Sequence, residues 1–208
     1  VAEKGNLFNA PETYMSKIAT GKIDKGVVDL DYPLEKNIKN ISEFNNKEVS
    51  SLTVCILDRP RHKQIIDKLK DLKVNIKLIK DGDVLGALYV SDPKYNVDMF
   101  LGTGGGPEGV IAASALDAYE CHFQGRFIFD NEKDVKEAKS MGIIDLDKKY
   151  DLFELVKGDS LFCATGITNN DFLNGIKIDN NKYVSETFVT HKESNLKKII
   201  KNVISLDE

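Results

Sequence analysis

At the centre of the sequence lies Val97–Ser114, which reads Val-Asp-Met-Phe-Leu-Gly-Thr-Gly-Gly-Gly-Pro-Glu-Gly-Val-Ile-Ala-Ala-Ser. The apolar run that ends at Leu101 predicts a buried strand, and residues 102–106 predict a turn with little side-chain bulk. Pro107 is typical of the first residue of a helix. Glycines let a ligand approach the backbone closely, and a helix start offers unpaired N–H groups to an anion. We therefore expect the chemistry of this protein at residues 102–108.

Glu108 falls in the first turn of the predicted helix, where its carboxylate has two interpretations. A negative charge there is favourable to the helix dipole, so Glu108 could be a capping charge and nothing more. Beside a bound phosphate the same charge would be repulsive unless a metal ion stood between the two groups. The sequence leaves both interpretations open.

Strands and helices alternate on both sides of this stretch. Apolar runs predict the strands, and apolar residues at helical spacing predict the helices. The predicted strands are residues 52–57, 74–79, 97–101 and 121–129, and the predicted helices are residues 60–72, 84–90 and 107–119. This pattern predicts an α/β fold with a parallel or mixed sheet flanked by helices, and ligands of such sheets bind beyond the carboxyl ends of the strands.

The two ends of the chain are less regular. Near the start, Pro11 to Ile18 predicts a short helix, and apolar spacing predicts another over residues 34–44. The C-terminal part is expected to form a helix over 132–141 and strands over 160–165, 175–178 and 183–189. Residues 179–182 predict a hairpin between the last two strands, whereas residues 195–204 fit a strand or an exposed helix equally well.

The composition favours a globular protein with a small-molecule partner. Of the 208 residues, 41% are hydrophobic and 30% are charged, which is enough for a substantial core. The formal net charge is −4 and the lysines are spread along the chain, which argues against a nucleic-acid surface. No apolar run reaches the length of a membrane helix, and the polar start lacks the pattern of a signal peptide, so we expect no membrane association.

The cysteines and histidines show no metal-binding or disulfide spacing. Cys55, Cys121 and Cys163 lie in strand-like stretches, which predicts buried, reduced thiols in a cytoplasmic protein. The three histidines are also too scattered for a metal cluster, and we expect them at the surface or as supporting residues. They are His62, His122 and His191.

Three expected turns follow predicted strands and carry complementary side chains. In the first, Arg59 and Arg61 lie at a helix start, where two guanidinium groups could grip a phosphate. The second, Asp81-Gly82-Asp83, could accept hydrogen bonds from sugar hydroxyls or join a cation site. Together with the turn at 102–108 they suit a phosphorylated polyol handled with a divalent metal ion. Simpler interpretations remain, with Arg59 in a local ion pair with Asp58 and Asp83 as a helix cap.

Five motifs together resemble one family of enzymes. They are Asn9-Ala-Pro-Glu-Thr-Tyr-Met15, Arg59-Pro-Arg-His62, Asp81-Gly-Asp-Val84, Gly104-Gly-Gly-Pro-Glu-Gly109 and Ala164-Thr-Gly-Ile-Thr168. In this order they resemble the class II fructose-1,6-bisphosphatases of bacteria, and the resemblance runs from Val1 to Glu208. That family belongs to the metal-dependent, lithium-sensitive sugar and inositol phosphatase superfamily. The resemblance therefore implies a layered α-β-α-β-α fold, with a mixed sheet flanked by helices in its C-terminal half.

The resemblance also implies an activity and a set of site residues. The implied reaction is hydrolysis of the 1-phosphate of fructose 1,6-bisphosphate in gluconeogenesis, dependent on Mn²⁺ or Mg²⁺, by a cytoplasmic homo-oligomer. Sedoheptulose 1,7-bisphosphate is a second candidate substrate, because its added carbon changes little at the reacting phosphate. Glu108 resembles a metal ligand. The residues that resemble substrate contacts are Tyr14, Arg59, Pro60, Arg61, Asp81, Gly82, Asp83 and Gly105.

One motif of the family does not occur in these 208 residues. It is the N-terminal Asp-Pro-(Ile/Leu)-Glu-Gly-Thr motif, which carries further acidic ligands. Two-metal hydrolysis needs several carboxylates and a group that orients water, so Glu108 alone cannot supply the site. We therefore expect the chain to be the C-terminal two-thirds of such an enzyme and to be inactive by itself, with the catalytic residues in an N-terminal segment that a separate chain could carry. On this view residues 1–50 are the remainder of an N-terminal phosphatase domain, and residues 51–208 are a C-terminal α/β domain that binds the sugar phosphate.

Two other functions remain open at this point. Residues 104–109 match the pattern G-x-G-x-x-G between a strand and a helix, and Asp130 follows the next predicted strand, as in a dinucleotide-binding module of an oxidoreductase. Against this, Glu108 puts negative charge where the pyrophosphate would lie. A non-catalytic sugar-phosphate sensor would keep Arg61 and Asp81 but would need no metal ligands.

Overall fold

The computed structural model describes residues 1–205, and in this part of the chain the strands form two sheets. The first sheet contains β1 (Tyr14–Thr20), β2 (Thr53–Leu57), β3 (Asn75–Ile79), β4 (Met99–Gly105), β5 (His122–Ile128) and β6 (Lys149–Asp151). Its order is β3-β2-β4-β1-β5-β6. The second sheet contains β7 (Leu161–Thr165), β8 (Lys177–Asp179), β9 (Lys182–His191) and β10 (Leu196–Ser205). The first sheet is mixed and the second is antiparallel.

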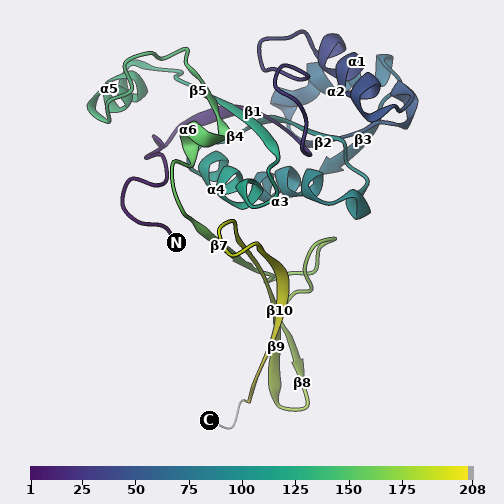
Figure 1. Ribbon diagram of the computed structural model, residues 1–208, viewed down its shortest axis with the longest axis vertical. Coiled ribbons are helices and arrows are strands. Elements are labelled where there is room, and N and C mark those ends of the chain that lie inside the picture. Colours follow the sequence, from purple (N-terminus) through teal and green to yellow (C-terminus); the bar gives the residue numbers. More distant parts are fainter. Residues whose placement is uncertain (206–208) are drawn as a thin grey trace.

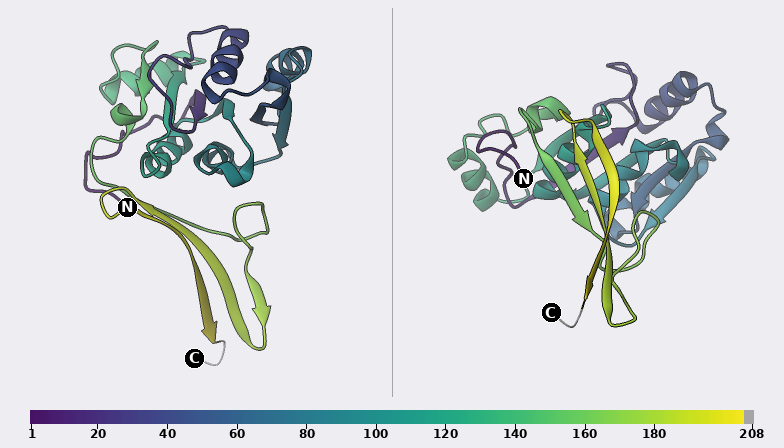
Figure 2. Two further views of the ribbon diagram at one scale, coloured as in Figure 1. Left: turned by 45° about the vertical axis from the view of Figure 1, so that its right-hand side comes forward. Right: turned by 60° about the horizontal axis from the view of Figure 1, so that its bottom comes forward.

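Helices cover both faces of the first sheet (Figure 1). The helices are α1 (Leu34–Asn45), α2 (Lys63–Asp71), α3 (Asp83–Leu88), α4 (Gly106–Asp117), α5 (Glu132–Ser140) and α6 (Leu152–Leu155), with short 3₁₀ helices at Val49–Ser51, Pro60–His62, Tyr89–Ser91 and Pro93–Tyr95. α1 and α2 lie on one face, α3 and α4 lie on the other, and the second sheet lies beyond α3 and α4 (Figure 2). The layers in the described residues thus run α-β-α-β, and the expected α/β class with a mixed, helix-flanked sheet is confirmed.

Each face of the first sheet has its own apolar core, because successive side chains of a strand point to opposite faces. On β1, Ile18 packs into the cluster beneath α1 and α2, while Met15 and Ala19 pack into the cluster beneath α3 and α4. Phe188 of β9 belongs to the second cluster, so the second sheet is held to the first layer through α4. The central strands are therefore buried on both faces.

The predicted helix from Pro11 to Ile18 is wrong, because most of this segment is the central strand β1. β1 pairs antiparallel with β4 on one side and with β5 on the other. A strand buried on both faces has no polar–apolar alternation, and Pro11 in front of it resembles a helix start. Instead, the Pro11 carbonyl accepts a hydrogen bond from the Thr13 N–H at 2.8 Å.

The predicted turn over 102–106 is also displaced. β4 continues through the glycines to Gly105, and α4 begins at Gly106, one residue before the predicted start at Pro107. The reason is pairing, because Gly102 to Gly105 lie in register opposite Lys17 to Tyr14 of β1. The glycines are thus the last residues of a strand, and the change of direction takes place at the first residues of the helix.

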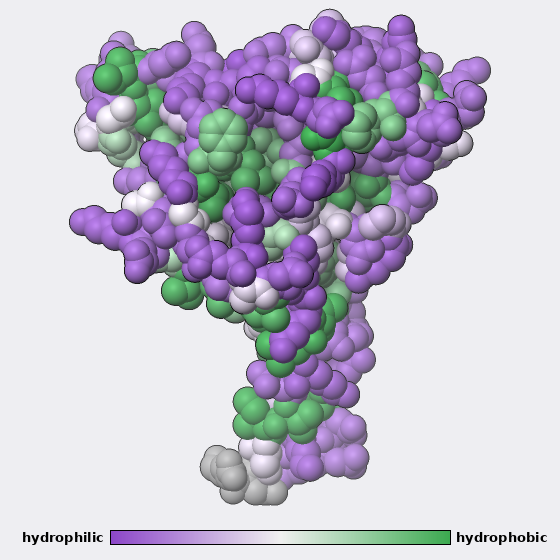
Figure 3. Space-filling model, viewed as in Figure 1, coloured by the Kyte–Doolittle hydropathy of each residue, from purple (hydrophilic) through white to green (hydrophobic). Residues whose placement is uncertain are grey.

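The predicted hairpin over 179–182 is confirmed, and residues 195–204, which fitted either structure, form most of strand β10. Asn180 and Asn181 have φ values of 47° and 59°, the left-handed pair that a two-residue hairpin turn requires. β8, β9 and β10 extend from the body as a narrow arm (Figures 1 and 2). Large apolar side chains are exposed on this arm, among them Ile178, Val203 and Ile204 (Figure 3).

The expectation for the cysteines holds at two of the three positions. Cys55 and Cys121 are buried free thiols, and burial raises the pKa of each to about 12. Cys163 is a free thiol on β7 but is exposed, so its predicted burial is wrong. Within residues 1–205, every helix is too short or too polar to cross a lipid bilayer.

Candidate active site

The turns singled out in the sequence meet at one edge of the first sheet. β2, β3 and β4 are parallel, so their carboxyl ends bring residues 59–61, 81–83 and 105–108 to the same side. β1 runs antiparallel to β4, so it is the start of β1 that reaches this edge, where Tyr14 lies in register with Gly105. The structure thus brings all the predicted site residues, from four separate segments of the chain, to one place.

Arg61 is fixed to the end of β4. Its Nε and Nη2 donate hydrogen bonds to the Thr103 carbonyl oxygen at 3.0 and 2.8 Å. Its guanidinium carbon lies 5.0 Å from the centroid of the Tyr14 ring, a cation–π distance. Arg61 and Tyr14 are both exposed, so the remaining guanidinium nitrogen can reach a ligand at the surface.

Of the two positions expected for the histidines, His62 takes the supporting one, because it is buried beside Thr103. Its Nε2 accepts a hydrogen bond from the Thr103 N–H at 2.8 Å, so its Nδ1 carries the proton and donates to the Leu57 carbonyl at 2.7 Å. A Cβ on Gly102 would lie 3.2 Å from the ring, which is why a glycine suits this point of β4. Burial is the main cause that lowers the pKa of His62 below its ordinary value of 6.5. Arg61 and His62 therefore both hold Thr103.

Arg59 pairs with Asp81 and not with its sequence neighbour Asp58. Nη2 of Arg59 lies 3.4 Å from Oδ1 of Asp81. With Asp58, Arg59 makes a hydrogen bond of 3.3 Å to the backbone carbonyl and no ion pair with the carboxylate. The local ion pair is thus replaced by one between the turns after β2 and β3. Gly82 has φ +82°, and this left-handed residue lets the chain turn from Asp81 directly into α3.

Asp83 lies in the first turn of α3 and makes no side-chain cap of that helix, so the capping interpretation is wrong. Its carboxylate forms an ion pair with Lys17 of β1, and the two side chains are 11% and 1% exposed. The sequence did not single out Lys17, because a helix over residues 11–18 would have left this lysine in solvent. Its one available signal was a lysine close in sequence to Met15 and Ile18, which is unusual for a buried strand.

Glu108 is exposed in the first turn of α4, and its carboxylate lies against the backbone of Gly105. A Cβ added to Gly105 would lie 1.8 Å from Oε2 of Glu108, so only glycine allows this approach. Within residues 1–205 the Glu108 carboxylate has no hydrogen bond or ion pair. It is therefore available as a ligand to a cation.

At the candidate site, Glu108 is the one unpaired carboxylate of the described residues that could bind a metal ion. Across residues 1–205, no three side chains of His, Cys, Asp or Glu gather in a way that could hold a metal. Asp83 is already engaged by Lys17, and Asp81 is shared with Arg59. The chemistry of Glu108 suits a divalent cation, but a complete coordination shell needs further oxygen ligands.

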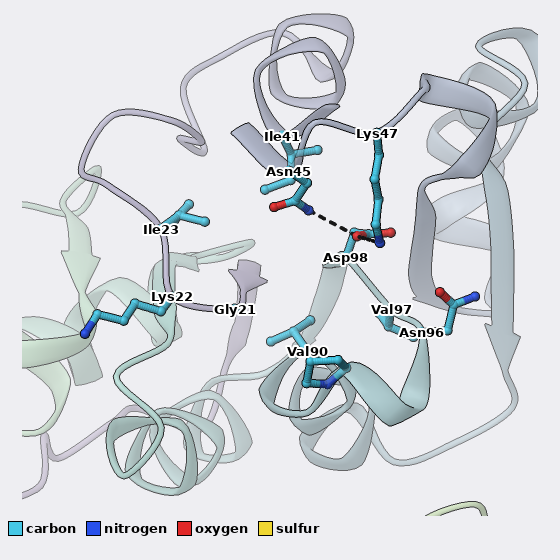
Figure 4. Close-up of a pocket in the computed structure, with 11 residues that line it drawn as sticks. Gly21, Lys22, Ile23, Ile41, Asn45, Lys47, Val90, Asn96, Val97 and Asp98 are labelled. Atoms are coloured by element: carbon cyan, nitrogen blue, oxygen red, sulfur yellow. Dashed lines mark hydrogen bonds and ion pairs between the residues drawn. The ribbon is translucent and has the colours of Figure 1, made fainter. Parts of the chain in front are cut away.

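A cavity of ≈ 350 Å³ lies at the opposite edge of the sheet, where β1 ends and β4 begins (Figure 4). Asn45 and Lys47 point toward Asp98 in this cavity, and their nitrogens lie 3.1 and 2.7 Å from its Oδ1. The Thr53 N–H donates to the other oxygen of Asp98 at 2.9 Å. This carboxylate is thus fully used in holding α1 to β2 and β4, and the cavity is separate from the candidate site.

The glycine-rich end of β4 is not an open cradle for a pyrophosphate. The space that side chains at Gly104 and Gly105 would fill holds the carboxylates of Asp83 and Glu108. In addition, β4 and β5 are separated by β1, whereas a dinucleotide-binding unit has its first two parallel strands side by side. The geometry therefore disfavours the dinucleotide-binding alternative.

Comparison with known proteins agrees with the motifs at this edge. Residues 1–204 match the family model described as bacterial fructose-1,6-bisphosphatase, glpX-encoded. The chain belongs to this family. Every residue of the candidate site lies within the matched range, so the glpX-type assignment and the geometry concern the same part of the chain.

Individual curated proteins are also similar in sequence to this chain. A protein of Synechococcus sp. (strain JA-2-3B'a(2-13)), named D-fructose 1,6-bisphosphatase class 2/sedoheptulose 1,7-bisphosphatase, is 39% identical over 207 residues, which cover 93% of this chain and 60% of that protein. Proteins of the same name from Trichodesmium erythraeum (strain IMS101) and Gloeobacter violaceus (strain ATCC 29082 / PCC 7421) are 36% and 34% identical. These matches cover 98% and 100% of this chain and 63% and 64% of the two relatives. The chain thus spans about three-fifths of the length of the curated relatives it matches.

Proposed function

We propose that this chain forms the sugar-phosphate-binding part of an enzyme that hydrolyses the 1-phosphate of fructose 1,6-bisphosphate in gluconeogenesis, giving fructose 6-phosphate and phosphate. One observation carries the proposal. Two guanidinium groups, an Asp-Gly-Asp turn and the unpaired carboxylate of Glu108, which lies against Gly105, meet at one edge of the sheet. The printed names of the relatives also include sedoheptulose 1,7-bisphosphatase, which supports that sugar as a second substrate.

Each residue has a role in this proposal. Arg59 and Arg61 hold the phosphate that is not cleaved, through paired charged hydrogen bonds, and Pro60 fixes the turn between them. The Asp81–Asp83 turn accepts hydrogen bonds from sugar hydroxyls. Tyr14 flanks the sugar, and Gly105 lets the substrate approach the backbone. These groups bind and orient the substrate, which lowers the entropy cost of the reaction.

Glu108 is the residue that would hold a divalent metal ion, Mn²⁺ or Mg²⁺. Such an ion supplies Lewis-acid chemistry and a more acidic bound water. The position of Glu108 against Gly105 sets its carboxylate beside the residues proposed to bind the sugar phosphate. Further carboxylates and the group that orients water are proposed to come from an N-terminal segment with the Asp-Pro-(Ile/Leu)-Glu-Gly-Thr motif, which these 208 residues do not contain.

Assembly, location and domain division complete the proposal. We place the protein in the cytoplasm as a homo-oligomer, and the exposed apolar side chains of the β8–β10 arm support self-association, because such patches are covered in assemblies. The superfamily of lithium-sensitive phosphatases and the division at residues 50 and 51 also stay predictions. Light scattering of the purified chain tests the oligomer.

The test of the function is phosphate release from fructose 1,6-bisphosphate. We compare the 208-residue chain with an extended protein that carries the acidic motif ahead of Val1, each with Mn²⁺, and monitor folding by circular dichroism. The extended protein should release phosphate from fructose 1,6-bisphosphate, and it should lose this activity when the metal is chelated. The 208-residue chain should be folded but release no phosphate. Equal turnover by both chains would refute the argument that ligands are missing.

The same comparison separates the alternatives. If neither chain releases phosphate but both bind the sugar bisphosphate in calorimetry, the non-catalytic sensor is the better description. Binding of NAD, with no response to Mn²⁺, would instead restore the dinucleotide-binding module. Release that continues after exhaustive chelation would remove the metal from the proposal.

A further inference from the structure

Lys17 is a charged side chain in the middle of the six-stranded sheet. It is 1% exposed, and β1 places it opposite Gly102 of β4 and Gly125 of β5. A buried ion pair seldom stabilises a fold more than apolar side chains of the same size, because both charges lose their hydration. Folding alone therefore gives little reason for a lysine at this position.

Glycines leave room for the Lys17 side chain. A Cβ on Gly109 of α4 would lie 3.0 Å from Cε of Lys17, and a Cβ on Gly104 would lie 3.2 Å from its Nζ. The same Cβ on Gly104 would lie 2.1 Å from Oδ2 of Asp83. The absence of side chains at these two positions thus lets the ammonium group and the carboxylate meet against the backbone of β4.

The contact with Lys17 uses only one oxygen of Asp83. Nζ of Lys17 donates to Oδ2, and Oδ1 has no hydrogen-bond partner within residues 1–205. Burial lowers the pKa of Lys17, while the nearby carboxylates of Asp83 and then Glu108 act to raise it. The ammonium group therefore contacts the carboxylate proposed for the sugar and also interacts electrostatically with the one proposed for the metal.

We propose that Lys17 is a positioning residue, which holds Oδ2 of Asp83 and so presents Oδ1 as an acceptor to a hydroxyl of the substrate sugar. The inference rests on the proposed function, since it assigns a role in binding the sugar of a sugar bisphosphate. Lys17 acts through Asp83 and not through the phosphates, which Arg59 and Arg61 hold. Its loss should therefore weaken recognition of the sugar and leave recognition of phosphate intact.

The test is calorimetric titration of the 208-residue chain with fructose 1,6-bisphosphate and with inorganic phosphate. Lys17→Met removes the charge at similar length, and we expect about a tenfold loss of affinity for the sugar bisphosphate, the cost of one hydrogen bond, with unchanged affinity for phosphate. Because Lys17 acts through Asp83, Lys17→Met combined with Asp83→Asn should bind no more weakly than Asp83→Asn alone. The control is Lys22→Met, which removes an exposed ion pair with Glu120 at 2.9 Å and should change neither affinity.

The outcomes are distinguishable. A folded Lys17→Met chain with wild-type affinity for the sugar bisphosphate, or with equal losses for both ligands, would overturn the inference. If Lys17→Met does not fold, the comparison of Asp83→Asn with the double variant decides, and any additional loss in the double variant overturns it. If the wild-type chain does not bind fructose 1,6-bisphosphate, both the proposed function and this inference are refuted. If the wild-type chain binds, the comparison of variants tests only the role of Lys17.

Discussion

Replacing Gly105 with alanine should separate catalysis from stability. Gly105 has φ −62° and ψ 142°, which alanine adopts without strain, and a compatible glycine-to-alanine change stabilises a protein by about 0.4–1 kcal/mol. The added methyl group would lie 1.8 Å from Oε2 of Glu108. Because Glu108 is exposed and flexible, its carboxylate can move away at little cost to folding.

The size of that movement gives the expected loss of activity. To reach an ordinary contact of 3.4 Å, the carboxylate oxygen must move by about 1.6 Å. Since a misplacement of about 1 Å can cost about 100-fold in rate, we expect kcat/KM of the extended protein to fall by about 100-fold or more. The Mn²⁺ concentration needed for half-maximal activity should rise, because the displaced carboxylate is the proposed metal ligand.

The assay is phosphate release by the extended protein over a range of Mn²⁺ concentrations, with thermal unfolding measured in parallel. Gly21→Ala is the matched control, since its methyl group would meet only the Val90 carbonyl, at 3.4 Å, at the opposite edge of the sheet. Wild-type kcat/KM and metal requirement in Gly105→Ala would refute the reasoning. A loss that adds fully to that of Glu108→Gln would show that Gly105 acts through its approach to the substrate and not through Glu108.

Two further predictions concern the side chains that hold Thr103. Arg61→Ala should raise KM of the extended protein by about tenfold or more, with a smaller effect on kcat, because the proposed charged hydrogen bond to the uncleaved phosphate is lost. Arg59→Lys should have a milder effect on KM, because the charge remains. An unchanged KM in Arg61→Ala would remove this residue from the site. His62 has a lowered pKa, so the unfolded chain binds its proton more readily, and the His62 contribution to the free energy of unfolding should be lost as the pH falls below 6.5. His62→Gln can keep an acceptor for the Thr103 N–H. In chemical denaturation this variant should therefore lose less stability than the wild type between about pH 7.5 and about pH 5.5, one unit either side of 6.5. Parallel profiles of stability against pH would contradict the assigned role.

Much of the candidate site could be predicted from the order of residues along the chain. Apolar runs before Arg59, Asp81 and Gly102 mark β2, β3 and the start of β4, and helices follow all three strands. Such a β-α alternation makes the strands parallel, which is enough to bring the turns after them to a single edge. The hairpin at Asn180 and Asn181 was equally predictable, because its turn residues act locally.

The start of β1 was not predictable in the same way. The sequence around Met15 to Ile18 has no alternation, because both faces of a central strand are buried, and only its pairing with β4 and β5 makes it a strand. This pairing puts Tyr14 beside Gly105 and Lys17 beside Asp83. A lysine whose burial depends on its two neighbouring strands carries little local signal of it.

Partner choice among charged groups was likewise decided by the tertiary structure. The sequence suggested a pair between Asp58 and Arg59 and left His62 either at the surface or in a supporting role. In the fold Arg59 pairs with Asp81, and His62 takes the supporting role beside Thr103. Adjacent residues in an extended segment point to opposite sides, so sequence proximity does not place their side chains together. The residue types and their edge of the sheet are therefore properties of the sequence. The contacts between them arise only in the tertiary structure, when β2, β3 and β4 pair and β1 adds Tyr14 and Lys17 to the same edge.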